Sequence, residues 1–125
     1  MDLPLVPPAS LPHVARALDA MRADPARRWT VAELARRAGL SRAAFARRFK
    51  EATGISPLRW LAEHRLTLAA ERLRTSGLTL ARVAALVGYA CEFAFAKAFK
   101  RAYGLPPGVY RRRARTAAPA FRAAA

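Results

Sequence analysis

The sequence predicts an all-α fold of about seven helices, in which two similar helix-turn-helix modules are joined by a long linker helix. The main observation is an internal repeat, because one pattern of six residues occurs twice with an offset of 50 positions. Two copies are too few for a solenoid, which usually needs at least about three stacked units. The pattern consists of Phe45, Phe49, Lys50, Gly54, Pro57 and Trp60 in the first copy, and of Phe95, Phe99, Lys100, Gly104, Pro107 and Tyr110 in the second.

The chain begins with residues 1–10, which hold three prolines and no helical period, so we expect a disordered lead-in. The first module covers residues 11–55. Its first helix shows apolar residues at helical spacing and should end close to Pro25, because the residue before a proline is driven away from the α conformation.

Two further helices of the first module follow, with a short turn between them. Thr30 and Glu33 form a capping box that opens the first of these helices, and Gly39 suits the left-handed position at its end. Ser41 can cap the second helix, residues 42–52. A helix, a short turn containing glycine and a second helix are typical of the helix-turn-helix motif.

The linker helix is predicted over residues 56–76, with Ser56 as its cap and Pro57 at its first helical position. Apolar residues occur nearly all around it, as expected of a helix that packs against two modules. About 19 helical residues are about 28 Å long, which compares with about 34 Å for one turn of B-DNA.

The second module, residues 77–113, repeats the first. Thr79 caps a short helix that ends at Gly88, and after a turn one residue longer than the first the next helix covers residues 92–103. A short last helix ends near Arg113, and residues 114–125 are predicted to be a disordered tail. The expected core residues of the two modules are Leu34, Ala35, Phe45, Phe49, Trp60, Val83, Ala84, Phe95, Phe99 and Tyr110.

The composition favours a polyanionic partner. The net charge is +15, the pI is about 11.7, and there are 20 Arg and 3 Lys, so nucleic acid is expected before a membrane. The single cysteine excludes an internal disulfide and any metal site with several cysteines. No apolar run approaches about 18 residues and no signal-peptide pattern is present. We therefore expect a soluble, cytoplasmic and nucleoid-associated protein.

One face of the helix over residues 42–52 is the first candidate reading surface. The second helix of a helix-turn-helix lies in the major groove, where its outward face reads base edges. Arg47 can donate two hydrogen bonds to guanine, while Ala43 and Ala46 can touch thymine methyl groups. Arg42, in the first turn, and Arg48, on the flank, are better placed for phosphates. The alternative is that these arginines are solvated surface.

The matching face of the helix over residues 92–103 is more ambiguous. Lys97 takes the place of Arg47, next to Ala96. Phe93 is either a core residue or a contact to a thymine methyl group, and Glu92 either accepts from cytosine or stabilises the helix N-terminus. Cys91 is expected to fill the turn rather than to sense redox state. The residues expected on the DNA backbone are Ser41, Arg48, Lys50, Lys100 and Arg101.

An enzymatic function is not predicted. The sequence contains no nucleophile elbow, no metal quartet and no glycine-rich phosphate loop. His13 and His64 lie on different helices without an acidic partner that suggests catalysis. No cofactor and no metal ion are expected.

Two stretches, ELARRAGLSRAAFARRFKEATGISPLRWL and VAALVGYACEFAFAKAFKRAYGLPPGVYR, resemble the DNA-binding domain of the AraC/XylS family. The resemblance covers about residues 11–113. It implies homeodomain-like modules that bind promoter or operator DNA on one face, in a transcription regulator that is most often an activator and contacts RNA polymerase. The residues that it places on the base-reading faces are Arg42, Ala43, Ala46, Arg47, Glu92, Phe93, Ala96 and Lys97.

The sequence also departs from this family. Cys91 stands where serine is usual, Phe93 where a polar residue is frequent, and Lys97 where arginine is frequent, so the second module is expected to read bases more weakly. Most members carry an N-terminal effector-binding or dimerisation domain. The proline-rich start resembles an interdomain linker, which favours a fragment over a free-standing regulator.

Three other functions remain as alternatives. A non-specific architectural DNA-binding protein fits the net charge and the second reading helix, which is poor in polar groups. A module that binds RNA polymerase or another protein would leave the basic surface incidental. DNA repair by a transfer cysteine ranks last, because Cys91 has no activating neighbours in the sequence.

Overall fold

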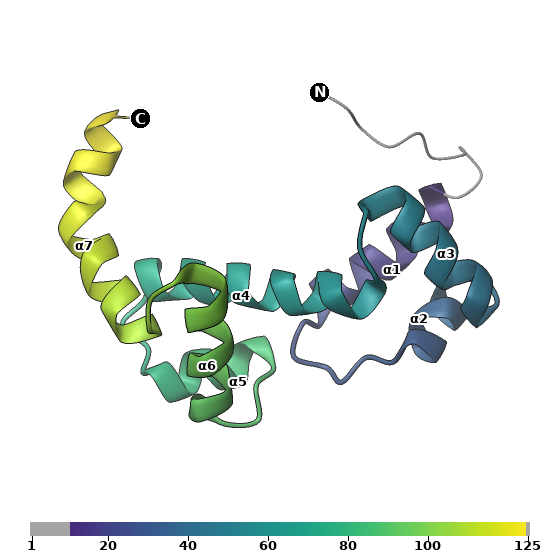
Figure 1. The fold of residues 1–125 in the computed structure, drawn as a ribbon, viewed down its shortest axis with the longest axis horizontal. Helices are drawn as coiled ribbons and strands as arrows, with labels where there is room; N and C mark the ends of the chain where they lie inside the picture. The colour runs from purple at the N-terminus through teal and green to yellow at the C-terminus, as the bar shows by residue number, and fades with distance from the viewer. Residues whose placement is uncertain (1–10, 125) are drawn as a thin grey trace. The chain divides into compact units, whose positions relative to one another are not determined.

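Seven α-helices make up the described part of the chain (Figure 1), and no strand occurs among residues 11–124. The computed structural model describes residues 11–124, with side chains for residues 12–116. The prediction of an all-α fold is confirmed, while the lead-in predicted at residues 1–10 lies outside the described residues. The helices are α1 (Leu11–Ala23), α2 (Val31–Ala38), α3 (Arg42–Thr53), α4 (Pro57–Thr75), α5 (Leu80–Val87), α6 (Glu92–Tyr103) and α7 (Pro107–Ala124).

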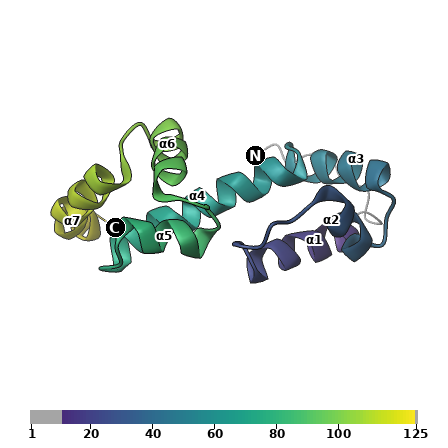
Figure 2. The same ribbon diagram turned by 90° about the horizontal axis from the view of Figure 1, so that it is seen from below.

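The chain forms two compact units that divide inside α4, between His64 and Arg65. Unit 1 contains α1, α2, α3 and the first part of α4, and unit 2 contains the rest of α4 with α5, α6 and α7. Figure 2 shows α1, α2 and α3 of unit 1, and α5 and α6 of unit 2. The helix predicted as a connector is therefore shared, because each half belongs to the core of its own unit.

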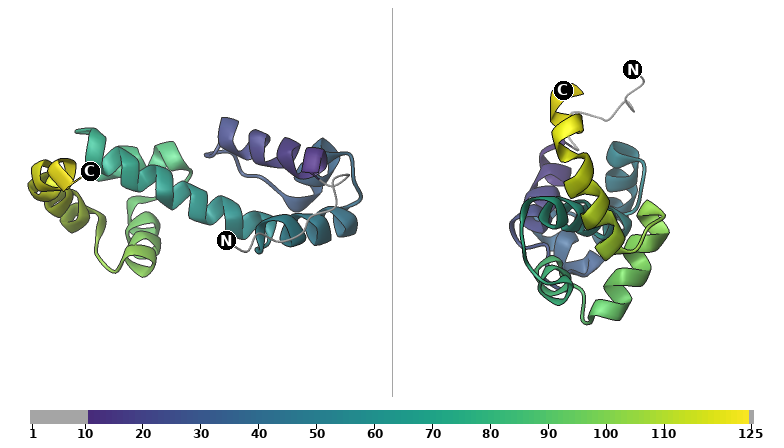
Figure 3. Two further views of the ribbon diagram at one scale, coloured as in Figure 1. Left: turned by 90° about the horizontal axis from the view of Figure 1, so that it is seen from above. Right: turned by 90° about the vertical axis from the view of Figure 1, so that its left-hand side faces the viewer.

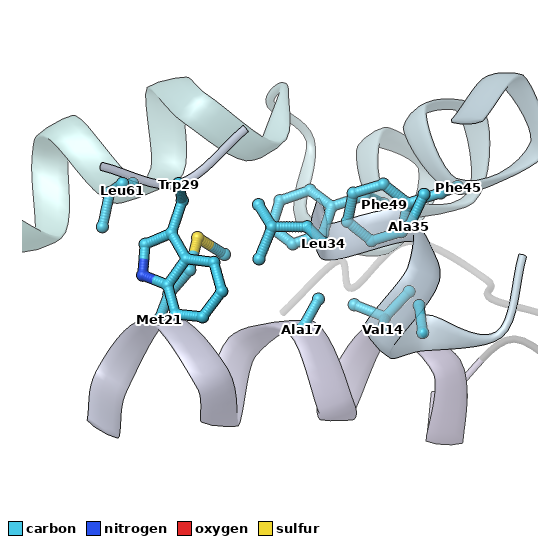
Figure 4. Close-up of a cluster of buried hydrophobic side chains, with 10 residues drawn as sticks. Val14, Ala17, Met21, Trp29, Leu34, Ala35, Phe45, Phe49 and Leu61 are labelled. Carbon is cyan, nitrogen blue, oxygen red and sulfur yellow. The ribbon is translucent and has the colours of Figure 1, made fainter. Parts of the chain in front are cut away.

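The core of unit 1 is built where α1, α2 and α3 meet the first turns of α4 (Figure 4). Phe45 and Phe49 of α3 have no exposed surface, and neither does Leu34 of α2. Trp29, in the segment before α2, is 5% exposed and donates a hydrogen bond from Nε1 to the carbonyl oxygen of Asp24 at 2.9 Å. The other buried members of this cluster are Val14, Ala17, Met21, Ala35, Ala38 and Leu61.

The core of unit 2 repeats this arrangement with the second part of α4 in the place of α1. Phe95 and Phe99 of α6 are fully buried, as are Val83 of α5 and Leu73 of α4. Figure 3 shows that α5 and α6 lie beside this part of α4 and that a loop connects α6 to α7. Tyr110 of α7 is partly buried and packs edge-on against Phe99, with ring centroids 5.2 Å apart.

Side-chain caps start the short helices where the sequence places them. The hydroxyl of Thr30 accepts from the backbone N–H of Glu33, and the hydroxyl of Thr79 accepts from that of Arg82, both at 3.1 Å. These bonds satisfy donors that have no partner inside the helix. Gly39 ends α2 in the left-handed conformation with φ 76°, as the sequence predicts.

The end of the chain differs from the expectation. The sequence predicts that the last helix stops near Arg113 before a disordered tail at residues 114–125, whereas α7 continues to Ala124. The physical reason is composition, because alanine and arginine are among the best helix formers and dominate this stretch.

None of the helices within residues 11–124 combines the length and the apolar character needed to cross a membrane.

His64 makes the stability of unit 1 dependent on pH. Its ring stacks on Trp60 with centroids 4.8 Å apart, and the guanidinium of Arg22 lies 5.4 Å from the centroid of the same Trp60 ring. Burial, and secondarily the charge of Arg22, lowers the pKa of His64 below its ordinary value of 6.5. The unfolded chain therefore binds more protons than the folded chain in the interval between the two pKa values.

We predict that the unfolding free energy of unit 1 falls as the pH drops from above 6.5 towards the folded-state pKa of His64. Both tryptophans, Trp29 and Trp60, belong to unit 1, so urea midpoints followed by tryptophan fluorescence report on this unit. His64→Gln should flatten this dependence. A dependence equally steep in the variant would contradict the assignment.

Two glycines in unit 2 isolate the cost of a left-handed backbone, because an added Cβ would be uncrowded at both. A Cβ added at Gly104 or at Gly77 would meet nothing within 4 Å, but only Gly104 has a left-handed φ, of 77°. We predict that Gly104→Ala destabilises unit 2 by about 1–2 kcal/mol, whereas Gly77→Ala is neutral or stabilises it by up to about 1 kcal/mol. All three tyrosines lie in unit 2, so near-ultraviolet circular dichroism of tyrosine during urea unfolding measures both variants.

Candidate nucleic-acid interface

Two phenylalanines determine which face of α3 is turned outward. Phe45 and Phe49, one turn apart, are buried with ring centroids 5.7 Å apart and an interplanar angle of 58°. In α6 the pair Phe95 and Phe99 has the same separation and the same angle. Because each pair is fully buried, the opposite face of its helix is left for solvent or a partner.

The outward face of α3 carries the residues predicted to read bases in the first module. Arg42, Ala43 and Arg47 are exposed, and Ala46 is half-buried between them. Nε of Arg47 lies 3.9 Å from Oε1 of Glu51, and both side chains are largely exposed. An exposed ion pair of this length contributes little to stability, so Arg47 can exchange it for a ligand at little cost.

The residues expected on the DNA backbone in the first module surround this face. Lys50 is exposed and Arg48 is half-buried. Ser41 is exposed, and its hydroxyl oxygen accepts from the backbone N–H of Ala44 at 3.2 Å as the cap of α3. The hydroxyl proton of Ser41 remains available for a phosphate oxygen.

In the second module the corresponding face of α6 is less polar. Glu92, Phe93 and Lys97 are exposed, and Ala96 is half-buried. Phe93 is 77% exposed, which excludes the alternative that it is a core residue. The residues expected on the backbone, Lys100 and Arg101, are also exposed, in the last turn of α6.

The sequence predicts Cys91 only as a residue of the turn, and the structure gives it a further role. Its Sγ accepts from the backbone N–H of Ala94 at 3.4 Å, so that it caps α6 as Ser41 caps α3. The signal was present in the repeat, since Cys91 lies 50 positions after Ser41. The exposed thiol is a weaker acceptor than a hydroxyl.

A second missed contact holds the first turn of the motif. Nδ1 of His13 donates to the carbonyl oxygen of Ala38 at 2.6 Å, and Nη1 of Arg16 approaches the same oxygen at 3.5 Å. Positive or donor groups at a helix C-terminus satisfy carbonyls that lack a partner inside the helix. Both side chains of α1 thus fix the end of α2 next to Gly39, where the turn towards α3 begins.

The described residues include no group of three or more His, Cys, Asp or Glu side chains arranged to hold a metal ion.

Comparison with known proteins gives a consistent result. The sequence matches the helix-turn-helix domain family over residues 34–113. It is 50% identical over 101 residues to a Streptomyces lividans protein described as an AraC-like transcription regulator, covering 81% of this chain and 33% of that protein. It is 41% identical over 108 residues to RclR of Escherichia coli K12, described as an RCS-specific transcriptional activator, covering 86% of this chain and 38% of RclR.

Among solved structures, the DNA-binding domain of AdpA, a global transcriptional factor crystallised with a target DNA, superimposes with a TM-score of 0.79. It is 33% identical in sequence, and the match covers 85% of this chain and 96% of that domain.

The fold, the repeated motif and these matches define the class. The chain belongs to the AraC/XylS family, as a DNA-binding domain with two helix-turn-helix modules. This is a family of transcription regulators and not of enzymes. The chain spans about a third of the length of the curated relatives that it matches.

Proposed function

We propose that this chain binds double-stranded DNA in a sequence-specific manner and regulates transcription, with α3 and α6 each reading a major-groove segment. The observation that carries the proposal is the pair of outward helix faces opposite the buried phenylalanines Phe45, Phe49, Phe95 and Phe99. Support comes from AdpA, whose DNA-binding domain was crystallised with its target DNA, and from relatives described as transcription regulators.

The roles on α3 follow from the chemistry of base edges. Arg47 is the residue that can donate two hydrogen bonds to guanine O6 and N7. Ala43 and Ala46 leave space for close approach and offer methyl groups to thymine. Arg42 reads a base or a phosphate at the edge of this segment, and Lys50 contacts phosphates.

The roles on α6 follow from a face that offers fewer hydrogen bonds. Lys97 donates to guanine or to a phosphate, and the exposed ring of Phe93 packs on a thymine methyl group, next to Ala96. Glu92 accepts from cytosine N4 or stabilises the N-terminus of α6. The backbone contacts that complete both modules are Ser41, Arg48, Lys50, Lys100 and Arg101.

The proposal extends to the whole regulator to which such a domain contributes. It includes activation through contact with RNA polymerase, an effector-binding domain of the kind found in the family, and a nucleoid location. These parts rest on the family and on the greater length of the curated relatives.

A non-specific architectural DNA-binding protein is the second candidate. It is favoured by the net charge of +15 and by the face of α6, where Phe93 and Ala96 offer no hydrogen bonds to bases. Such a protein would bind duplexes through phosphates alone, with strong salt dependence and no preferred sequence.

Selection from a randomised duplex pool at about 150 mM salt, where non-specific affinity is weakened, separates the two candidates. Two enriched blocks of sequence are expected if both helices read bases. A single block would restrict reading to α3, and binding without enrichment would favour the architectural function.

We predict that Arg47→Ala weakens binding to the selected duplex by about 1–3 kcal/mol and relaxes the preference at one base pair. Lys50→Ala should weaken binding to selected and random duplexes alike and reduce the salt slope by about 1. Fluorescence anisotropy on both duplexes measures the two effects. Equal losses on both duplexes for both variants would refute the division between a base contact and a phosphate contact.

A further inference from the structure

Positive charge is distributed unevenly between the two units. Unit 1 has eleven basic and six acidic residues, net +5, and unit 2 has twelve basic and two acidic residues, net +10. In unit 1, arginines pair with acidic side chains, as in Arg27 with Glu33 at 2.6 Å and Arg59 with Glu63 at 3.1 Å. In the described part of unit 2, neither Glu71 nor Glu92 forms an ion pair. Unit 2 therefore carries most of the uncompensated charge.

Much of this charge is gathered where α7 packs against the end of α4. We call this group the arginine cluster; it consists of Arg74 of α4 and of Arg111, Arg112, Arg113 and Arg115 of α7. None of these residues belongs to the reading faces or to the backbone contacts assigned above.

Three members of the arginine cluster are held by hydrogen bonds. Nε of Arg111 donates to the carbonyl oxygen of Leu73 at 3.2 Å, and Nη2 of Arg115 donates to that of Ser76 at 2.7 Å. Nη1 of Arg74 donates to the hydroxyl of Tyr110 at 2.9 Å. Such bonds restrict the guanidinium groups before any ligand binds, so that less side-chain entropy is lost on binding.

Within the described part of the chain, the arginine cluster still has a guanidinium nitrogen without a hydrogen-bond acceptor and positive charges without an acidic partner. Nη2 of Arg111 is buried and has no hydrogen-bond partner among the described residues. Burial, and secondarily the charge of Arg115, lowers the pKa of Arg111 from its ordinary value. An anion at this place would relieve the repulsion between the two guanidinium groups. Arg112 and Arg113 add two exposed guanidinium groups beside them.

The arginine cluster lies on the helix that follows the second reading helix. α7 begins three residues after Gly104, which ends α6, and the rings of Tyr103 and Tyr110 pack with centroids 5.4 Å apart. The beginning of α7 therefore packs against the C-terminal end of α6.

We propose that the arginine cluster is an additional DNA-binding surface, which takes phosphate groups of the duplex backbone beside the segment read by α6. This inference rests on the proposed DNA-binding function and deepens it. Guanidinium groups bind phosphates through paired, charge-assisted hydrogen bonds. The cluster thereby compensates in affinity for the few hydrogen bonds that the face of α6 offers to bases, and it adds no sequence preference, because phosphates carry none.

The test compares two charge-matched double variants of the 125-residue chain. The first, Arg112→Gln with Arg113→Gln, removes two exposed members of the cluster and leaves Arg74, Arg111 and Arg115 with their hydrogen bonds in place. The control, Arg28→Gln with Arg36→Gln, removes two exposed arginines of unit 1 that lie outside α3. A third variant, Arg112→Lys with Arg113→Lys, keeps the charge. Circular dichroism and thermal melting verify the folding of all three.

Binding to one selected and one random duplex is measured by fluorescence anisotropy between about 50 and about 200 mM salt. For the cluster variant we expect a salt slope smaller by about 2 and a loss of affinity on the order of tenfold at the upper salt concentration, equal on both duplexes. The control should change the slope by less than half as much, and the lysine variant should retain most of the wild-type slope.

Equal slope changes in the cluster variant and the control would reduce the effect to net charge and overturn the inference. An unchanged slope in the cluster variant would overturn it as well, and would leave the surface to a partner such as an acidic protein. Absence of salt-dependent binding in the wild-type chain would instead refute the proposed function. The wild-type measurement therefore distinguishes the two failures.

Discussion

The burial of two phenylalanines on each reading helix is the constraint on which the rest of the structure depends. Removing one such ring typically costs about 3–5 kcal/mol, whereas an exposed pair such as Arg47 with Glu51 contributes at most about 1 kcal/mol. The rotation of α3 and of α6 about their own axes is therefore determined by Phe45, Phe49, Phe95 and Phe99. The set of residues that faces outward follows from that rotation.

The two units share this core geometry and differ in chemistry. Unit 1 combines a hydroxyl cap at Ser41 with an arginine on the reading face, and its charges are partly paired. Unit 2 has a thiol cap at Cys91, an exposed Phe93 and a net charge of +10 over residues 65–125. We propose that these differences divide the roles, so that unit 1 supplies most of the hydrogen bonds to bases and unit 2 supplies most of the affinity for phosphates.

Local patterns explain what the sequence could predict. The caps at Thr30 and Thr79 and the buried faces of α3 and α6 depend on residues within one or two turns, so spacing alone revealed them. Spacing could not decide whether Phe93 is buried, since that depends on which neighbours cover the helix. The contacts of Arg111 with Leu73 and of Arg115 with Ser76 join positions 38 and 39 residues apart, which no local pattern indicates. The continuation of α7 to Ala124 lies beyond the last position of the repeat, Tyr110, so the repeat could not predict it.

Methylation interference with dimethyl sulfate tests whether the outward faces of α3 and α6 enter the major groove. This reagent methylates guanine at N7 in the major groove and adenine at N3 in the minor groove. The account predicts that methylated guanines inside the selected site block binding, and that Arg47→Ala abolishes the block at one of them. Interference confined to adenine N3, or none at any base, would contradict major-groove reading by these helices.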